Sequence, residues 1–181
     1  MSIIERNTRE TQIRLELSAG TGAEPEVDTA VPFLDHMLRT LARYGGLDLG
    51  VTARGDLRHH LIEDVGITLG LAVRDETPPT CTRYGSATIA MDDALVEVSL
   101  DLGGRAFYRG PVPSSLYDHF LRSFADNAAL TLHVRMLRGN DRHHIVEAAF
   151  KALGLALRQA LAPGGAVFST KGQIRIERGD A

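Results

Sequence analysis

The chain has 181 residues, of which 44% are hydrophobic and 24% are charged, a balance typical of a globular protein with a substantial core. The net charge of −3 and the absence of tryptophan give no support to nucleic-acid binding. No apolar run approaches the roughly 20 residues that cross a bilayer, and the charged N-terminus lacks the apolar core of a signal peptide. The single cysteine, Cys81, excludes an internal disulfide, so we expect a cytoplasmic protein with no membrane partner.

The first half of the chain predicts the element order β-β-α-β-α. Its strands are indicated by alternation of polar and apolar side chains, and its first helix by a proline at the start and a glycine pair at the end. The predicted elements are strands at 12–17 and 27–30, a helix from Pro32 to Gly45-Gly46, a strand at 47–53 and a helix at 61–73.

The second half repeats this order after a proline-rich linker at 75–82. Its predicted elements are strands at 86–91 and 95–102 joined by an Asp92-Asp93 turn, a helix at 117–127, a strand at 130–136 and a helix at 145–161. We therefore expect an α+β fold made of internally duplicated β-β-α-β-α units, each a mixed sheet with helices packed on one side. The mixed outer strand faces could meet each other or another subunit.

Two histidine motifs are repeated along with these elements. Arg-His-His-x-x-Glu occurs at 58–63 and 142–147, and Asp-His-x-Leu-Arg occurs at 35–39 and 118–122. Six of the seven histidines belong to these motifs, while His133 has no counterpart and is interpreted as an ordinary polar strand residue. Duplicated packing does not require paired histidines, whereas a divalent transition metal does favour them.

Helical spacing divides the paired histidines between two metals. Residues four apart share a helix face, so His59 and Glu63 can hold one ion, and His143 and Glu147 another. The neighbouring His60 and His144 point about 100° away and must serve a different ion, completed from the other half or from another chain. Imidazole and carboxylate ligands without thiolate favour Mn, Fe, Co or Zn over Ca or Mg.

Motifs along the whole chain resemble the imidazoleglycerol-phosphate dehydratase family. The matching segments are 6–11, 33–38, 59–66, 83–86, 118–120, 132–134, 143–151 and 169–172. The resemblance implies a hydro-lyase of histidine biosynthesis that converts imidazoleglycerol phosphate, a small phosphorylated imidazole, to imidazole-acetol phosphate and water. It also implies two Mn²⁺ ions per active site and a homo-oligomer of 24 subunits with active sites between subunits.

The resemblance assigns roles residue by residue. Metal ligands are implied at His36, His59, His60, Glu63, His119, His143, His144 and Glu147. Substrate contacts are implied at Glu10, Arg83, Arg105, Ser169 and Lys171, with Glu10 as the candidate catalytic base. One domain is expected over 1–181, made of repeats at about 1–77 and 83–165 and a substrate-binding segment at 166–181.

Three features depart from the family pattern. The turn at Gly55-Asp56 runs directly into the paired histidines, Tyr44 replaces a usual histidine, and the stretch 162–168 is short. None of these changes removes a predicted metal ligand. From the residues alone, two alternatives stay open: a different dinuclear metalloenzyme such as a hydrolase, and a non-catalytic assembly whose metals join subunits.

Overall fold

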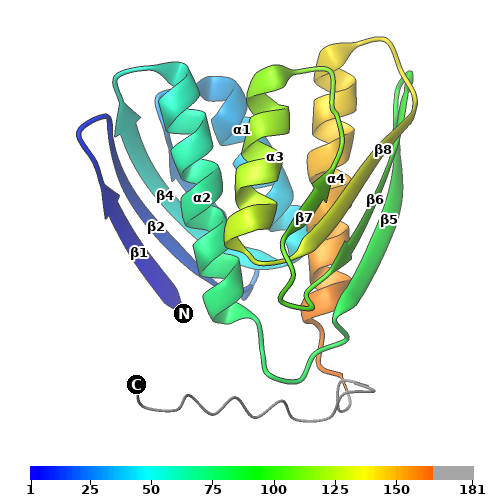
Figure 1. The fold of residues 1–181 in the computed structure, drawn as a ribbon, viewed down its shortest axis with the longest axis horizontal. Helices are drawn as coiled ribbons and strands as arrows, with labels where there is room; N and C mark the ends of the chain where they lie inside the picture. The colour runs from blue at the N-terminus through cyan, green and yellow to red at the C-terminus, as the bar shows by residue number, and fades with distance from the viewer. Residues whose placement is uncertain (165–181) are drawn as a thin grey trace, which may run out of the picture.

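The computed structural model describes residues 1–164. Within them, four helices lie between two four-stranded mixed sheets, one sheet and two helices coming from each half of the chain (Figure 1). The predicted α+β class and the internal duplication are confirmed. Each half contains one strand more than expected, so that the repeated unit is β-β-β-α-β-α.

The first sheet has the strand order β1-β2-β4-β3. Its half of the chain comprises β1 (Ser2–Asn7), β2 (Thr11–Ala19), β3 (Glu26–Asp28), α1 (Pro32–Gly45), β4 (Leu47–Gly55) and α2 (Arg58–Glu76). The strand expected at 27–30 is β3, and it pairs in parallel with β4 at the edge of the sheet. The unexpected strand β1 forms the opposite edge of the sheet. Its polar and apolar side chains do not alternate with burial, because apolar Ile3 is exposed while polar Ser2 is buried.

The second sheet repeats this topology with the order β5-β6-β8-β7. Its half comprises β5 (Tyr84–Met91), β6 (Ala94–Asp101), β7 (Phe107–Arg109), α3 (Ser115–Asn127), β8 (Thr131–Arg138) and α4 (Arg142–Leu161). Strand β7 has only three residues and pairs in parallel with β8, which is too short a segment to show a period in sequence.

The helices interlock the two halves, because α1 packs against α4 and α2 packs against α3. Two glycines allow this close approach. A Cβ atom at Gly70 would lie 2.5 Å from the carbonyl oxygen of Phe124, and one at Gly154 would lie 2.6 Å from that of Leu41. The paired helices run in the same direction, so that all four begin at one end of the molecule (Figure 1).

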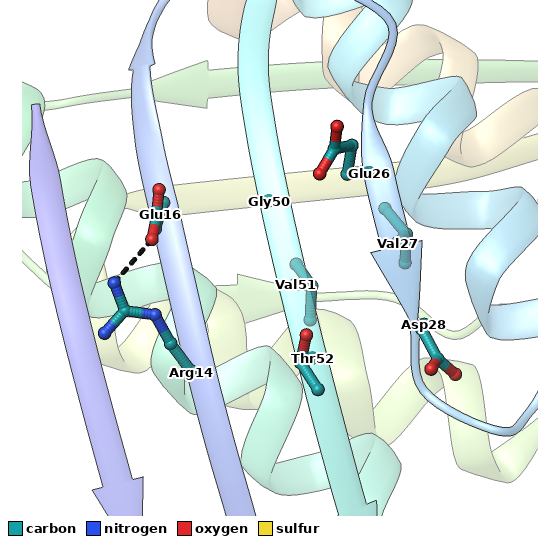
Figure 2. Close-up of a pocket in the computed structure, with 8 residues that line it drawn as sticks. All are labelled: Arg14, Glu16, Glu26, Val27, Asp28, Gly50, Val51 and Thr52. Carbon is teal, nitrogen blue, oxygen red and sulfur yellow. Dashed lines mark hydrogen bonds and ion pairs between the residues drawn. The ribbon is translucent and has the colours of Figure 1, made fainter.

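The outer faces of the two sheets lie on opposite sides of the molecule, so within one chain they do not meet each other (Figure 1). On the first sheet a shallow hollow of about 400 Å³ is lined by acidic side chains from β2 and β3 (Figure 2). Its one arginine, Arg14, is already paired with Glu5 and Glu16 at 2.6 Å each. The hollow therefore offers no free cation to an anionic ligand. In the part of the chain described, no helix is both long and apolar enough to span a membrane.

Candidate metal centre

The shared direction of the helices brings both histidine motifs to one end of the molecule. His36 and His119 lie just after the first turns of α1 and α3, and the paired histidines open α2 and α4. Pro32 at the start of α1 and the Asp141 carboxylate, which accepts the His143 backbone N–H at 2.7 Å, help to fix two of these starts. The ligand set is thus presented on helix termini with fixed backbone geometry.

One cluster contains His36, His143 and Glu147, whose possible ligand atoms all lie within 4.8 Å of one another. The Nε2 atoms of the two histidines are 3.1 and 3.0 Å from Oε2 of Glu147. Lys151 donates to the other carboxylate oxygen at 3.0 Å. Burial raises the pKa of Glu147, but the hydrogen bonds from Lys151 and His36 outweigh it, so the net pKa is lowered and the ligand is held as the anion.

The second cluster contains His59, Glu63 and His119 within the same 4.8 Å limit. The Nε2 atoms of His59 and His119 lie 3.5 and 3.6 Å from the two oxygens of Glu63. The residue one turn beyond Glu63 is Ile67, where the first cluster has Lys151. The two clusters therefore contain the same residue types, but only the carboxylate of the first cluster has a lysine one helical turn away.

Each cluster joins the two repeats. Helical spacing predicted the pairing of each glutamate with a histidine four residues earlier, and left open which half or chain would complete the site. The structure supplies the third residue from the other half of the same chain: His36 reaches α4, and His119 reaches α2. Two imidazoles and one carboxylate, exposed on one side and free of thiolate, suit a divalent transition metal.

His60 and His144 do not join either cluster. Their rings are nearly perpendicular to those of His59 and His143, at 79° and 84°. Each instead faces a carboxylate, with Nδ1 of His60 2.9 Å from Asp56 and Nδ1 of His144 2.8 Å from Asp93.

These two aspartates change the acid–base properties of the histidines. Hydrogen bonds to Asp56 and Asp93 raise the pKa of His60 and of His144. Backbone N–H groups of Asn140 and Asp141, together with His144, lower the pKa of Asp93 to about 2. Sequence reasoning did not single out Asp56 or Asp93. The only available signal was that Asp56 stands four residues before His60.

Glu10 lies at the same end, in the loop between β1 and β2, with a carboxylate oxygen 3.6 Å from Nδ1 of His60. Hydrogen bonds fix this loop, because Oγ1 of Thr8 accepts the backbone N–H of Glu10 at 3.1 Å. Thr11 donates to the buried carboxylate of Asp64, which also pairs with Arg6 at 3.0 Å. Asp64 follows Glu63 in α2, so the loop that carries Glu10 is tied to the helix that carries a cluster residue.

The predicted substrate arginines lie at the other end of the molecule. The backbone N–H of Arg83 donates to Ala160 at the C-terminal end of α4, and the carbonyl of Arg105 accepts from Thr131 at the start of β8. The histidines open α4, whose 20 residues span about 30 Å. One chain therefore does not bring these arginines to its own metal clusters. Ser169 and Lys171 lie outside the described residues.

A model of the imidazoleglycerol-phosphate dehydratase family matches residues 29–157. The chain belongs to this family. The imidazoleglycerol-phosphate dehydratase of Moorella thermoacetica is 44% identical over 88% of the chain and 89% of its own length. A solved structure of the enzyme from Pyrococcus furiosus is 43% identical with a TM-score of 0.85, covering 94% of this chain and 100% of that one. The Staphylococcus aureus structure is 32% identical with a TM-score of 0.80, covering 89% and 98%. The chain is accordingly a hydro-lyase.

Two departures from the family pattern have visible consequences. The short turn before the paired histidines places Asp56 directly against His60. Tyr44, in place of the usual histidine, puts its ring 5.9 Å from the ammonium of Lys151, within the range of a cation–π contact. Tyr44 thus borders the cation beside Glu147, and it lies on the same helix as the cluster residue His36.

Proposed function

We propose that this chain dehydrates imidazoleglycerol phosphate to imidazole-acetol phosphate in histidine biosynthesis, at two-manganese sites completed between subunits. Family membership supports the reaction over the hydrolase and metal-joining alternatives. The proposal that sites form between subunits rests on one observation. The metal clusters lie at one end of α4, and Arg83 and Arg105 lie at the other end. A neighbouring chain is needed to bring the two ends together.

The chain offers eight side chains for metal ligation. His36, His143 and Glu147 would hold one ion, and His59, Glu63 and His119 would hold another. His60 and His144 are then left to complete ions held by neighbouring copies. When bound, manganese supplies Lewis acidity and a template that fixes the imidazole ring of the substrate.

The reaction is difficult because the proton lost from carbon is not adjacent to a carbonyl group. A base must remove that proton while the neighbouring hydroxyl leaves, and the resulting enol then becomes the ketone. We assign the base to Glu10, because its carboxylate lies beside His60 on a loop fixed by Thr8 and Asp64. Its side chain is 56% exposed, so a substrate can reach it.

The phosphate group of the substrate is a dianion and needs cationic partners. Arg83, Arg105, Ser169 and Lys171 are assigned to it, reaching the site from a neighbouring subunit. Asp101 orients Arg83 by accepting from Nε at 2.6 Å and from Nη2 at 3.0 Å. Charge-assisted hydrogen bonds from planar guanidinium groups suit a phosphate dianion. The assembly proposed for these contacts is a closed particle of 24 subunits.

The direct test is to incubate the manganese-loaded full chain with imidazoleglycerol phosphate and to follow formation of the ketone. We expect turnover that is lost on chelation and regained when Mn²⁺ is added. A fully loaded, assembled protein that forms no ketone would overturn the proposed reaction.

Replacing Arg105 by alanine should raise KM roughly 10- to 100-fold, because a hydrogen bond to a charged group contributes about 1.5–3 kcal/mol. Manganese content should be unchanged, since Arg105 is remote from both clusters. Arg43→Ala is a matched control, because Arg43 is also exposed but pairs with Glu24 on the surface. Lower metal content with an unchanged KM would instead give Arg105 a structural role.

A further inference from the structure

We propose that Asp56 and Asp93 are positioning residues that orient His60 and His144, so that each presents Nε2 to a metal ion shared with a neighbouring copy. This inference rests on the proposed function for the presence of the metal. Two contacts support the proposal. Nδ1 of His60 lies 2.9 Å from Oδ1 of Asp56, and Nδ1 of His144 lies 2.8 Å from Oδ1 of Asp93.

The chemistry of the partners fixes the tautomer. An ionised carboxylate only accepts hydrogen bonds, so Nδ1 of each ring must carry the proton. In the neutral ring, the lone pair that can bind a metal is then on Nε2. The four clustered histidines also direct Nε2 at their glutamates. All six histidines would therefore ligate through the same nitrogen.

Nε2 is the ring nitrogen that does not face the aspartate. Nε2 of His144 has Asp92 at 3.4 Å, and that side chain is 70% exposed. His60 and His144 lie outside both ligand clusters of their own chain, and their ring planes are almost perpendicular to those of His59 and His143. Each nitrogen is therefore left for an ion that a second copy of the chain helps to hold.

The two carboxylates come from positions that are not equivalent in the repeats. Asp56 stands four residues before His60, in the turn that leads into α2. The position four residues before His144 is Asn140, which carries no charge. There the carboxylate comes from Asp93 in the β5–β6 turn, 51 residues earlier in the chain. Glu10, which precedes β2 as Asp93 precedes β6, lies 3.6 Å from Nδ1 of His60, so Asp56 makes the shorter of the two carboxylate contacts to that ring. A carboxylate beside Nδ1 is what both sites share.

Asp93 is also the more firmly held of the two. Its Oδ2 accepts the backbone N–H groups of Asn140 and Asp141 at 2.6 and 3.1 Å, which leaves Oδ1 to His144. Asp56 accepts the N–H of Leu57 at 2.6 Å with the same oxygen that faces His60. A structural role in fixing the start of α4 is therefore the competing explanation for Asp93.

Manganese titration of the metal-stripped full chain tests the proposal, with bound metal measured by elemental analysis. Asp56→Asn and Asp93→Asn should each weaken metal binding about 10- to 100-fold, as loss of an outer-shell partner does in other sites. Asp48→Asn is the matched control. Its carboxylate likewise accepts a backbone N–H in a turn, from Thr21 at 3.0 Å, but no histidine contacts it.

A double-mutant cycle separates positioning from a structural role. Added to His144→Ala, Asp93→Asn should weaken metal binding by less than about two-fold, because there is no ring left to orient. An equal loss with and without His144 would overturn the proposal for Asp93, and normal metal binding by either aspartate variant would overturn it for that residue. Because metal is measured without substrate, failure of the dehydratase assay would leave these results unaffected.

Discussion

Replacing His60 or His144 by alanine should almost abolish dehydration. Each of these histidines is the member of its pair that lies outside its own chain's cluster. If it completes an ion held by a neighbouring copy, as proposed, its loss leaves that ion one ligand short. A missing ligand changes both the coordination geometry of the ion and the charge that its ligands donate to it. The loss of activity should therefore exceed the roughly 10- to 100-fold that follows from removing an outer-shell partner.

The seventh histidine supplies the control. His133 lies on the exposed face of β8, its ring 5.5 Å from that of Phe107, and belongs to neither cluster. His133→Ala should keep both its manganese and its activity. Steady-state rates and metal content of the three variants, measured on the same preparations, check the prediction. Full activity with normal metal content in His60→Ala or His144→Ala would remove that residue from the ligands.

Removing the metal should also dissociate the particle. If His60 and His144 ligate ions held by neighbouring copies, the free energy of ligation is available only to the assembled state. The chelated protein should sediment as a much smaller species, and Mn²⁺ should restore a large closed particle. Analytical ultracentrifugation with and without chelator, with metal content verified, makes the comparison.

Acid should act in the same direction. A histidine must be neutral to ligate, so protonation below its unperturbed pKa of about 6.5 competes with the metal. Asp56 and Asp93 raise the pKa of His60 and His144, so protonation of these two should begin at a higher pH than that of a free histidine. If metal-free protein at neutral pH keeps the full particle mass, assembly does not depend on these histidines, and the argument for intersubunit sites is lost.

The metal clusters show most clearly which contacts could be predicted from the sequence. The i,i+4 spacing of His59 with Glu63, and of His143 with Glu147, is a local property of a helix, and the structure shows both contacts. That His36 reaches α4 and His119 reaches α2 depends on how the helices of the two halves pack. No spacing within either repeat contains that information.

The same limit explains what sequence reasoning missed. Asp93 meets His144 only because the β5–β6 turn lies over the start of α4, a contact between residues 51 positions apart. Strand β1 was missed because its side-chain polarity does not follow its burial: apolar Ile3 is exposed and polar Ser2 is buried. The role of Asp56 was within reach, since it precedes His60 by one helical turn, but a lone aspartate in a turn is a common feature.

The common starting end of the four helices has an electrostatic consequence. Each helix carries the equivalent of about half a positive charge at its N-terminus, so four such dipoles converge on the end that must hold cations. Alone, that field would repel a metal ion and attract anions instead. Glu63, Glu147, Asp56 and Asp93 all lie within this field. The negative charges of these carboxylates oppose the positive field of the helix N-termini. A helix terminus that alone would favour an anion can therefore hold a divalent cation.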